Sequence, residues 1–340
     1  MKRKKKMITT NPRPQAGGFF LAKRPLALAQ KASKDLLGLK ETSRERIVEI
    51  LQISQNYKER LQSQQKKGDE LRGKTLMNLF FEPSTRTRVS FELAAKNLSA
   101  ELMNMSPATS SLSKGESLKD MIANLEAMNP HIMVVRHAVS GVPGFIARNT
   151  RAAVINAGDG SHEHPTQGLL DLFTVKEKLG EIKGLHLVIV GDIAYSRVAR
   201  SNIYGFTKLG AKITVVGPAT LIPPGLDQLG VKVGHDLDQC LPHADVVMLL
   251  RIQKERQETL NFPSLTEYSR FFGLTKERRA RMNPKAIIMH PGPINRGIEI
   301  DPDVADNIGA EQGPQSVILN QVHNGTAVRM AVLALYGANS

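Results

Sequence analysis

The feature that most constrains this chain is a series of short apolar runs separated by amphipathic segments. Runs such as LHLVIVG (185–191) and KAIIMH (285–290) are apolar at consecutive positions, so both faces of the strands that they form must be buried. Parallel strands covered by helices on both faces have this pattern. The sequence therefore predicts an α/β fold with two doubly wound, Rossmann-like parallel sheets. The predicted strands are Thr75–Phe81, Ile132–Arg136, Ala152–Asn156, Leu185–Gly191, Lys212–Gly217, Val246–Leu250 and Ala286–His290.

The polar stretch KLGEIK (178–183) is the clearest internal boundary, with three predicted strands before it and four after it. We therefore expect a first domain at residues 35–180 and a second at 181–320. Near the C-terminus, Gly325–Tyr336 is predicted to be an amphipathic helix, and residues 321–340 are expected to pack back on the first domain.

A further helix is predicted at the start of the first domain. Thr42 and Glu45 have the spacing of a capping box, in which each side chain satisfies a backbone N–H at the helix start. The apolar stripe expected on this helix is Ile47, Ile50, Leu51, Ser54, Tyr57 and Leu61.

The net charge of +14 comes mostly from the N-terminus. Ten Lys or Arg residues precede the first acidic residue, Asp35, whereas the rest of the chain carries 36 basic and 32 acidic residues. Residues 1–34 combine a KRKKK run with three prolines, so we predict a disordered tail. Three interpretations of this segment are open. It is a solvated tail, it lies upstream of a true start at Met7, or it is a tether to nucleic acid or another acidic surface.

Two classes of protein are disfavoured by composition. No apolar run approaches the ~20 residues of a membrane helix, so we expect no membrane association. Cys240 is the single cysteine, which rules out a disulfide framework within the chain and fits a cytoplasmic protein.

The motif with the most polar and charged side chains is FFEPSTRTR (80–88), at the end of the first predicted strand. A helix is predicted to begin near Ser84, so three hydroxyls and two guanidinium groups crowd its first turn. Unpaired N–H groups at a helix start favour an anion, and arginine matches the oxygens of a phosphate. The alternative is an ordinary N-cap serine with a solvated arginine pair.

Three more motifs lie in the first half. The loop SSLSKGES (110–117) carries Lys114 and either delivers an ammonium group to a phosphate or is a solvated surface loop. Arg136 and His137 lie at the end of a predicted strand. After the next strand, NAGDGSHEHPTQ (156–167) contains His164, whose neutral imidazole suits a carbonyl oxygen better than a metal, because no third ligand has a suitable spacing.

In the second half, the strand ending at Gly191 is followed by no G-x-G-x-x-G motif, which disfavours NAD. Arg197 and Arg251 follow two strands there, and each suits a carboxylate. HPGP at residues 290–293 forms a proline-locked turn. Ligands bind beyond the carboxyl ends of parallel strands, where all these residues lie. The pattern indicates a site that joins a phosphorylated and a carboxylated small molecule.

In order and spacing, the motifs STRTR (84–88), HPTQ (164–167), Arg197, Arg251-x-Gln253 and HPGP (290–293) resemble the aspartate/ornithine carbamoyltransferases. The resemblance runs from about residue 35 to the C-terminus. It implies transfer of the carbamoyl group from carbamoyl phosphate to L-aspartate, early in pyrimidine biosynthesis, with no cofactor or metal. It also implies a homotrimer with shared active sites, and leaves open a larger assembly with regulatory chains or dihydroorotase.

The resemblance implies the following roles for residues of this chain. The phosphate of carbamoyl phosphate would be held by Ser84, Thr85, Arg86 and Thr87. Its carbamoyl oxygen would be surrounded by Thr87, Arg136 and His164, and its amide would contact Gln167. Aspartate would be held by Lys114, Arg197, Arg251 and Gln253. Ser110 and Lys114 would come from the neighbouring subunit, and the backbone carbonyls of Gly292 and Pro293 would orient the substrates. Arg86, Thr87, Lys114, Arg136 and His164 would act in catalysis.

One departure and three alternatives accompany this resemblance. Some family members have Leu where this chain has Gly292, and we expect a looser turn with little loss of function because the implied contact is through the backbone. An ornithine-specific member would carry Cys at Pro291 and lack the Arg-x-Gln pair. A nucleic-acid-binding protein is disfavoured by the near-neutral body and 5% aromatic residues. A catalytically dead relative would not need the complete set of motifs.

Overall fold

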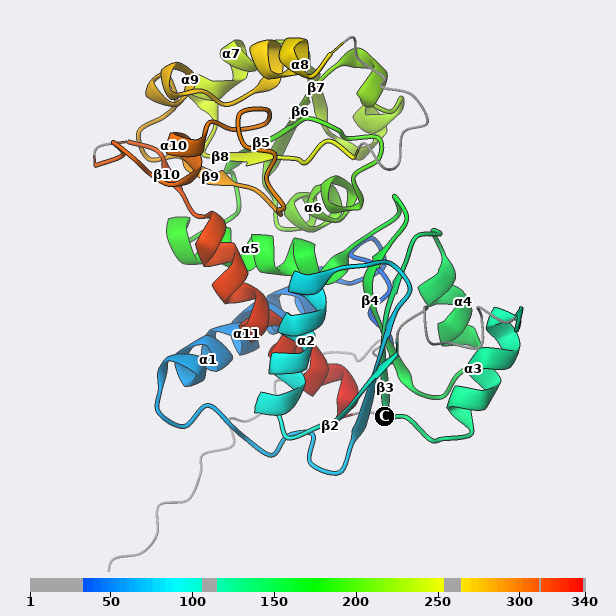
Figure 1. Cartoon of the computed structure of the whole chain (residues 1–340). Helices are drawn as coiled ribbons and strands as arrows, with labels where there is room; N and C mark the ends of the chain where they lie inside the picture. Colours follow the sequence, from blue (N-terminus) through cyan, green and yellow to red (C-terminus); the bar gives the residue numbers. More distant parts are fainter. Residues whose placement is uncertain (1–32, 106–114, 254–263, 312, 339–340) are drawn as a thin grey trace, which may run out of the picture. The chain divides into compact units, whose positions relative to one another are not determined.

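The computed structural model describes residues 33–105, 115–253, 264–311 and 313–338 (Figure 1). Within them, strands form two sheets in which every neighbouring pair is parallel. The first sheet contains β1 (Thr75–Phe80), β2 (Glu101–Met105), β3 (Ile132–His137) and β4 (Ala153–Asp159). The second contains β5 (His186–Val190), β6 (Lys212–Val216), β7 (Lys232–Gly234), β8 (Val246–Leu249), β9 (Ile287–Met289) and β10 (Gln315–Ser316). The predicted α/β class with two parallel sheets is confirmed.

The strand order determines where a ligand can bind. The first sheet runs β2-β1-β3-β4 and the second runs β10-β9-β8-β5-β6-β7, which is the 3-2-1-4-5-6 order of dinucleotide-binding folds. The order reverses between β1 and β3 in one sheet and between β5 and β8 in the other. Connections leave these neighbouring strands toward opposite faces, so a crevice opens at their carboxyl ends.

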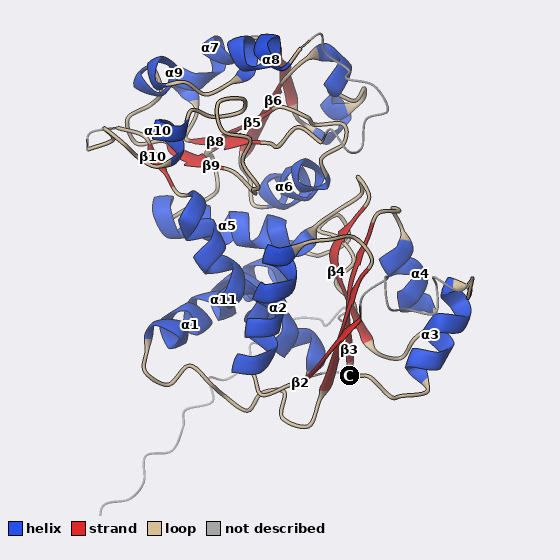
Figure 2. Cartoon of the chain, in the orientation of Figure 1, coloured by secondary structure: helices blue, strands red, loops and turns tan. Residues whose placement is uncertain are grey.

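Helices cover both faces of the sheets (Figure 2). Those of more than one turn in the first half are α1 (Arg44–Gln62), α2 (Thr85–Asn97), α3 (Leu118–Glu126), α4 (Val142–Arg148) and α5 (Pro165–Leu179). The second half adds α6 (Arg197–Lys208), α7 (Leu237–Cys240), α8 (Leu265–Phe272), α9 (Lys276–Ala280), α10 (Pro302–Ala305) and α11 (Ile318–Gly337). In the first sheet, α3 and α4 pack on one face, and α2, α5 and α11 pack on the other.

Strand β5 shows why the apolar runs predicted this architecture. Leu187 and Ile189 belong to a core that continues through α5 and α6, whereas Val188 and Val190 belong to a second core under α7 and the segment around α10. All four side chains are buried. Because successive side chains of a strand point to opposite faces, only a strand covered on both faces needs an apolar residue at every position.

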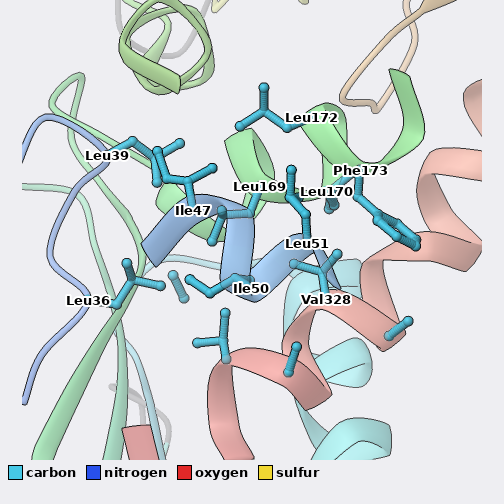
Figure 3. Packing of buried hydrophobic residues seen from close by; sticks show 14 of the residues in the cluster. Leu36, Leu39, Ile47, Ile50, Leu51, Leu169, Leu170, Leu172, Phe173 and Val328 are labelled. Atoms are coloured by element: carbon cyan, nitrogen blue, oxygen red, sulfur yellow. The ribbon is translucent and has the colours of Figure 1, made fainter. Parts of the chain in front are cut away.

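The largest core joins α1, α5 and α11, and Figure 3 shows its centre. There Ile47, Ile50 and Leu51 of α1 pack against Leu169 of α5 and Val328 of α11. Fully burying one such side chain stabilises the fold by roughly 1.5–3 kcal/mol. Helix α11 also contacts α2, so this C-terminal helix packs on the elements of the first sheet, as predicted.

Three details of the prediction are wrong. The capping box at Thr42 does not form, because Ser43 is the N-cap of α1 and accepts a hydrogen bond from the N–H of Arg46, while the Thr42 hydroxyl donates to the carbonyl of Gly38. The first sheet has a fourth strand, β2, and the second has two unpredicted strands, β7 and β10. Helix α11 begins at Ile318, seven residues earlier than predicted.

Residues 1–32, nearly all of the predicted tail, lie outside the described residues. Within the part of the chain that the structure describes, no helix is both long enough and apolar enough to cross a membrane.

Candidate active site

A cavity of about 420 Å³ lies at the carboxyl ends of the strands that flank both reversals of strand order. Residues 82–87 follow β1, and Arg136 lies near the end of β3. Residues 196–198 follow β5, and Arg251 follows β8. The fold therefore brings four strand ends from two sheets to one cavity, which the ligand-binding rule for open α/β sheets anticipates.

Twelve of the fourteen residues that the resemblance assigned to the site line this cavity. Its walls include Ser84, Thr85, Arg86, Thr87, Arg136, His164, Gln167, Arg197, Arg251, Gln253, Gly292 and Pro293. The remaining two, Ser110 and Lys114, lie outside the described residues. The cavity wall is thus mainly hydroxyl, amide and guanidinium groups, which are the groups that bind phosphate and carboxylate oxygens.

The start of α2 forms the anion-binding end. Ser84 is the N-cap residue, yet its side chain makes no capping hydrogen bond, so its hydroxyl is not used as an ordinary cap. No acidic residue occupies the first turn of α2, where the helix dipole is positive. Partial burial and the positive charge of Arg251 lower the pKa of Arg86, which remains a cation at neutral pH. This end of the cavity is therefore strongly electropositive.

Gly292 lies directly against Arg86. A Cβ atom at position 292 would lie 2.6 Å from Nη1 of Arg86, and φ of Gly292 is +63°. Both features favour glycine, because the guanidinium fills the space of a side chain and L-residues rarely adopt this backbone conformation. The glycine that departs from some family members thus allows a close contact with the predicted phosphate-binding arginine.

His290, at the end of β9, faces the same cavity as a neutral imidazole. Burial and the charges of Arg86 and Arg251 lower its pKa to about 3. Its Nδ1 accepts a hydrogen bond of 2.8 Å from the backbone N–H of Gly292, so the proton of the neutral ring is on Nε2. Within the described residues Nε2 has no hydrogen-bond partner, and it is a buried donor at the cavity wall.

Glu82 links two arginines that were predicted to bind different parts of the substrates. Its Oε1 lies 2.8 Å from Nη2 of Arg136 and 2.6 Å from Nη2 of Arg197. Its Oε2 also accepts from Nη1 of Arg197 at 2.9 Å. Both arginines are nearly buried, and a carboxylate beside them offsets the cost of removing two charges from water.

His164 is fixed at the N-cap of α5 through its backbone. Its N–H donates to the Ser201 hydroxyl at 2.9 Å, and that hydroxyl donates to Glu163 at 2.8 Å. Glu163 also accepts from the N–H groups of Leu39 and Lys40. The backbone of His164 is therefore held by a buried network that spans α5, α6 and the segment before α1.

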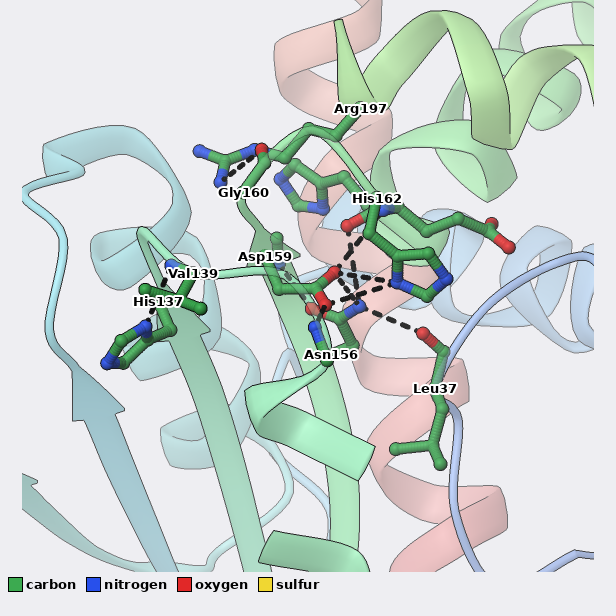
Figure 4. Close-up of polar contacts among 12 residues, drawn as sticks. Leu37, His137, Val139, Asn156, Asp159, Gly160, His162 and Arg197 are labelled. Atoms are coloured by element: carbon green, nitrogen blue, oxygen red, sulfur yellow. Dashed lines mark hydrogen bonds and ion pairs between the residues drawn. The ribbon is translucent and has the colours of Figure 1, made fainter. Parts of the chain in front are cut away.

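His162 has a different environment (Figure 4). Its Nδ1 lies 3.1 Å from Oδ2 of Asp159, and this contact raises the pKa of His162. Oδ1 of Asp159 accepts a hydrogen bond from Nδ2 of Asn156. His162 does not line the cavity. In the described part of the chain, no three His, Cys, Asp or Glu side chains gather as metal ligands would.

Several cavity residues were not predicted. The sequence indicates His290 only as part of a turn, and it does not predict Ser90, Ser196, Gln321 or Arg329 as site residues. Arg329 is buried on α11. It donates from Nη1 to the Ser90 hydroxyl at 2.9 Å, and its guanidinium lies over the ring of Phe91. Burial lowers its pKa to about 10, so it is still charged at neutral pH. An arginine within the apolar run of the C-terminal helix was the only available signal.

Two family models together match almost the whole chain. The carbamoyl-P binding domain of aspartate/ornithine carbamoyltransferase matches residues 34–177, and the Asp/Orn binding domain matches residues 183–336. The chain belongs to the aspartate/ornithine carbamoyltransferase family. The first model covers the cavity residues up to Leu170, and the second covers those from Ser196 onward.

Individual relatives and solved structures agree with this family assignment. The chain is 57% identical over 302 residues to the aspartate carbamoyltransferase catalytic subunit of Opitutus terrae, covering 89% of this chain and 94% of the relative. It is 55% identical over 304 residues to that of Syntrophobacter fumaroxidans, covering 89% and 98%.

Among solved structures, the catalytic subunit of M. jannaschii aspartate transcarbamoylase has a TM-score of 0.76 with this chain at 36% identity, covering 89% of this chain and 97% of that one. Aspartate transcarbamoylase of Trypanosoma cruzi in complex with N-(phosphonacetyl)-L-aspartic acid gives 0.80 at 27% identity, covering 88% and 94%.

Proposed function

We propose that this chain transfers the carbamoyl group of carbamoyl phosphate to the α-amine of L-aspartate, giving N-carbamoyl-L-aspartate and phosphate. The observation that carries the proposal is one cavity in which the cationic start of α2 meets two arginines from the second half of the chain. The relatives named above are aspartate carbamoyltransferase catalytic subunits, and a similar solved structure binds carbamoyl phosphate together with aspartate.

The donor is assigned to the electropositive end of the cavity. Ser84, Thr85 and Thr87 offer hydroxyls and Arg86 offers a planar fork, so a phosphate dianion there is surrounded by donors and positive charge. The start of α2 adds backbone N–H groups. Because both substrates are anions, these cations must offset their mutual repulsion before the two molecules can lie within reacting distance.

The reaction builds negative charge on the carbamoyl oxygen. The neutral α-amine attacks the carbamoyl carbon, and the carbon–oxygen bond to phosphate then breaks. Thr87, Arg136 and His164 line the cavity together, and we assign them as donors to that oxygen, with each such donor typically lowering the barrier by about 3 kcal/mol. The departing phosphate accepts the amine proton, so no side-chain base is required.

The acceptor is assigned to the arginines contributed by the second half. Arg197 and Arg251 provide one guanidinium for each carboxylate of aspartate, with Gln253 beside them. Ornithine has a single carboxylate and a cationic side chain, so a second guanidinium would repel it. The charge of the cavity therefore favours aspartate as the acceptor.

We also infer properties that extend beyond one chain. By the family resemblance, three chains form a trimer in which Ser110 and Lys114 complete the neighbour's site, and Lys114 contacts aspartate. The domains are assigned as residues 35–180 for carbamoyl phosphate and 181–320 for aspartate, with 321–340 returning to the first domain. The single cysteine supports a cytoplasmic location, and the product supports a place early in pyrimidine biosynthesis.

Phosphate release with carbamoyl phosphate, comparing aspartate with ornithine as acceptor, tests the proposed reaction. We expect turnover with aspartate and at least 100-fold lower kcat/KM with ornithine. Binding of phosphonoacetyl-L-aspartate, followed by calorimetry, should occur with a stoichiometry of one per chain. Equal turnover with the two acceptors, or no heat with the bisubstrate analogue, would contradict the proposal.

A further inference from the structure

A fully buried carboxylate, Asp171, lies one helical turn after Gln167 on α5 and does not itself line the cavity. Its Oδ1 accepts a hydrogen bond of 2.9 Å from Nε2 of Gln167 and one of 2.8 Å from Nε2 of Gln321. Its Oδ2 accepts one of 2.8 Å from Nδ2 of Asn202. Three amide groups from α5, α6 and α11 thus point their nitrogens at one carboxylate.

An ionised carboxylate can only accept hydrogen bonds, and this decides how each neighbouring amide is oriented. If the side-chain amide of Gln167 rotated by 180°, its oxygen would face the Asp171 oxygen and a buried acceptor would lose its donor. The nitrogen of Gln167 is therefore fixed toward Asp171, and its oxygen is turned away from Asp171. Gln167 lines the cavity, so the orientation of this amide decides whether an acceptor or a donor faces a ligand there.

The environment of Asp171 keeps the carboxylate ionised near neutral pH. Burial raises its pKa to about 6, while the three amides and the positive charge of Arg329 oppose a larger rise. At pH 8 the group is thus ionised and acts only as an acceptor.

We propose that Asp171 is a positioning residue that presents the amide oxygen of Gln167 to the amino group of carbamoyl phosphate. This inference rests on the proposed function. A carbamoyl group carries two N–H donors, and an acyl group such as acetyl carries a methyl in the same place. An acceptor held at that point favours carbamoyl over acetyl, because a buried acceptor facing a methyl group has no donor. Asp171 therefore contributes to donor specificity without touching the substrate.

The deciding measurement is the preference for carbamoyl phosphate over acetyl phosphate. Carbamoyl phosphate is assayed as substrate, and acetyl phosphate is assayed as a competitive inhibitor against it. In Asp171→Leu, the amide of Gln167 can turn either way, so we expect KM for carbamoyl phosphate to rise about 10- to 100-fold and Ki for acetyl phosphate to change less than about threefold. A similar rise in both constants would show a general structural defect and overturn the proposal.

Two further variants test whether Asp171 acts through Gln167. In Gln167→Leu, the preference for carbamoyl phosphate over acetyl phosphate should fall as it does in Asp171→Leu. The variant that combines Asp171→Leu with Gln167→Leu should show no additional loss of this preference. Additive losses would mean that Asp171 does not act through Gln167, which contradicts the proposal.

A variant in which the side chains of residues 171 and 202 are exchanged should retain the orientation of Gln167. It also tests the proposal if Asp171→Leu does not fold. In the double variant Asp171→Asn with Asn202→Asp, the new carboxylate accepts from the nitrogen of residue 171, whose oxygen then faces Gln167 and Gln321. We expect the preference to stay within about threefold of the parent. Loss of the preference in a folded exchange variant would overturn the proposal. Absence of carbamoyl transfer by the parent chain would instead refute the proposed function.

Discussion

Arg86 and Arg88 lie two positions apart at the start of α2 but have different surroundings. Arg86 lines the cavity and lies against Gly292, whereas Arg88 is half-exposed and reaches Glu92 one turn along the helix, with 3.4 Å between Nε and Oε1. The pair therefore separates the effect of a charge in the cavity from the effect of a charge on the helix.

Arg86→Ala should lower kcat/KM at least 100-fold, because the phosphate loses a bidentate charged partner worth about 3 kcal/mol. Arg88→Ala should change kcat/KM less than about threefold, because an exposed ion pair contributes little. Steady-state assays with melting temperatures for both variants make the comparison. Appreciable activity in Arg86→Ala would show that the phosphate is held elsewhere.

Arg251→Ala should act mainly on the second substrate. We expect KM for aspartate to rise at least about 10-fold and KM for carbamoyl phosphate to change little, since the arginine is assigned to a carboxylate of aspartate. Steady-state kinetics with each substrate varied in turn gives both constants. An unchanged KM for aspartate would remove Arg251 from the acceptor site.

His290 should make the protein sensitive to acid. Its pKa in the folded state is about 3, against 6.5 in the unfolded chain, so below pH 6.5 the unfolded state binds a proton that the folded state does not. The neutral ring contributes stability that is complete above pH 6.5 and is lost as pH falls toward 3, by up to about 5 kcal/mol.

His290→Asn keeps an acceptor for the N–H of Gly292 and cannot be protonated. Between pH 7 and pH 4 its melting temperature should fall less than that of the parent chain. Parallel melting curves for the two proteins would refute the predicted role of His290 in acid sensitivity.

At the scale of single elements, two helix starts show how the same residue type serves different purposes. Ser43 caps α1 by accepting a hydrogen bond of 3.1 Å from the N–H of Arg46, and Ser84 begins α2 without a side-chain cap. A serine at the first position is therefore structural in α1 and available for a ligand in α2.

Ser43→Ala should destabilise the fold by about 1 kcal/mol and leave both KM values unchanged. Ser84→Ala should leave the melting temperature nearly unchanged and raise KM for carbamoyl phosphate. Thermal unfolding and steady-state kinetics on the two variants test the contrast. A large loss of stability in Ser84→Ala would mean that its hydroxyl acts as a cap after all.

The strands predicted from the sequence are those buried on both faces, such as β5 and β8. The missed strands β2, β7 and β10 all lie at sheet edges, and mostly exposed positions give them no apolar run to recognise. The start of α1 was misplaced by one residue because Thr42 and Ser43 are both capable caps. Local backbone geometry decides which of two such residues becomes the N-cap, and the sequence pattern does not give that geometry.

At the scale of the whole molecule, some residues of the site could be predicted from the sequence and others could not. Residues that follow strands could be predicted, because all parallel strands of a sheet end at the same edge. Gln321 and Arg329 could not, since they reach the cavity only through the packing of α11 against α5 and α2. The partnership of Asp171 with Gln321, 150 residues apart, likewise depends on tertiary packing.

A trimer with shared sites predicts that two inactive variants restore each other. Arg86→Ala and Lys114→Ala should each be nearly inactive as pure proteins. If they are dissociated and reassembled in equal amounts, each mixed trimer contains one intact site, so activity should return to on the order of a quarter of the parent value. Size-exclusion chromatography of the mixture confirms its assembly state. No recovery of activity in reassembled trimers would contradict shared sites.

The bridge from Glu82 to Arg136 and Arg197 has a consequence for selectivity among simple ions. An internal carboxylate already balances part of the positive charge, so chloride or acetate from the buffer must compete with a tethered group whose effective concentration is high. Only a ligand that engages several cations at once can compete well. The enzyme should therefore tolerate ordinary salt better than the number of arginines in its cavity would indicate.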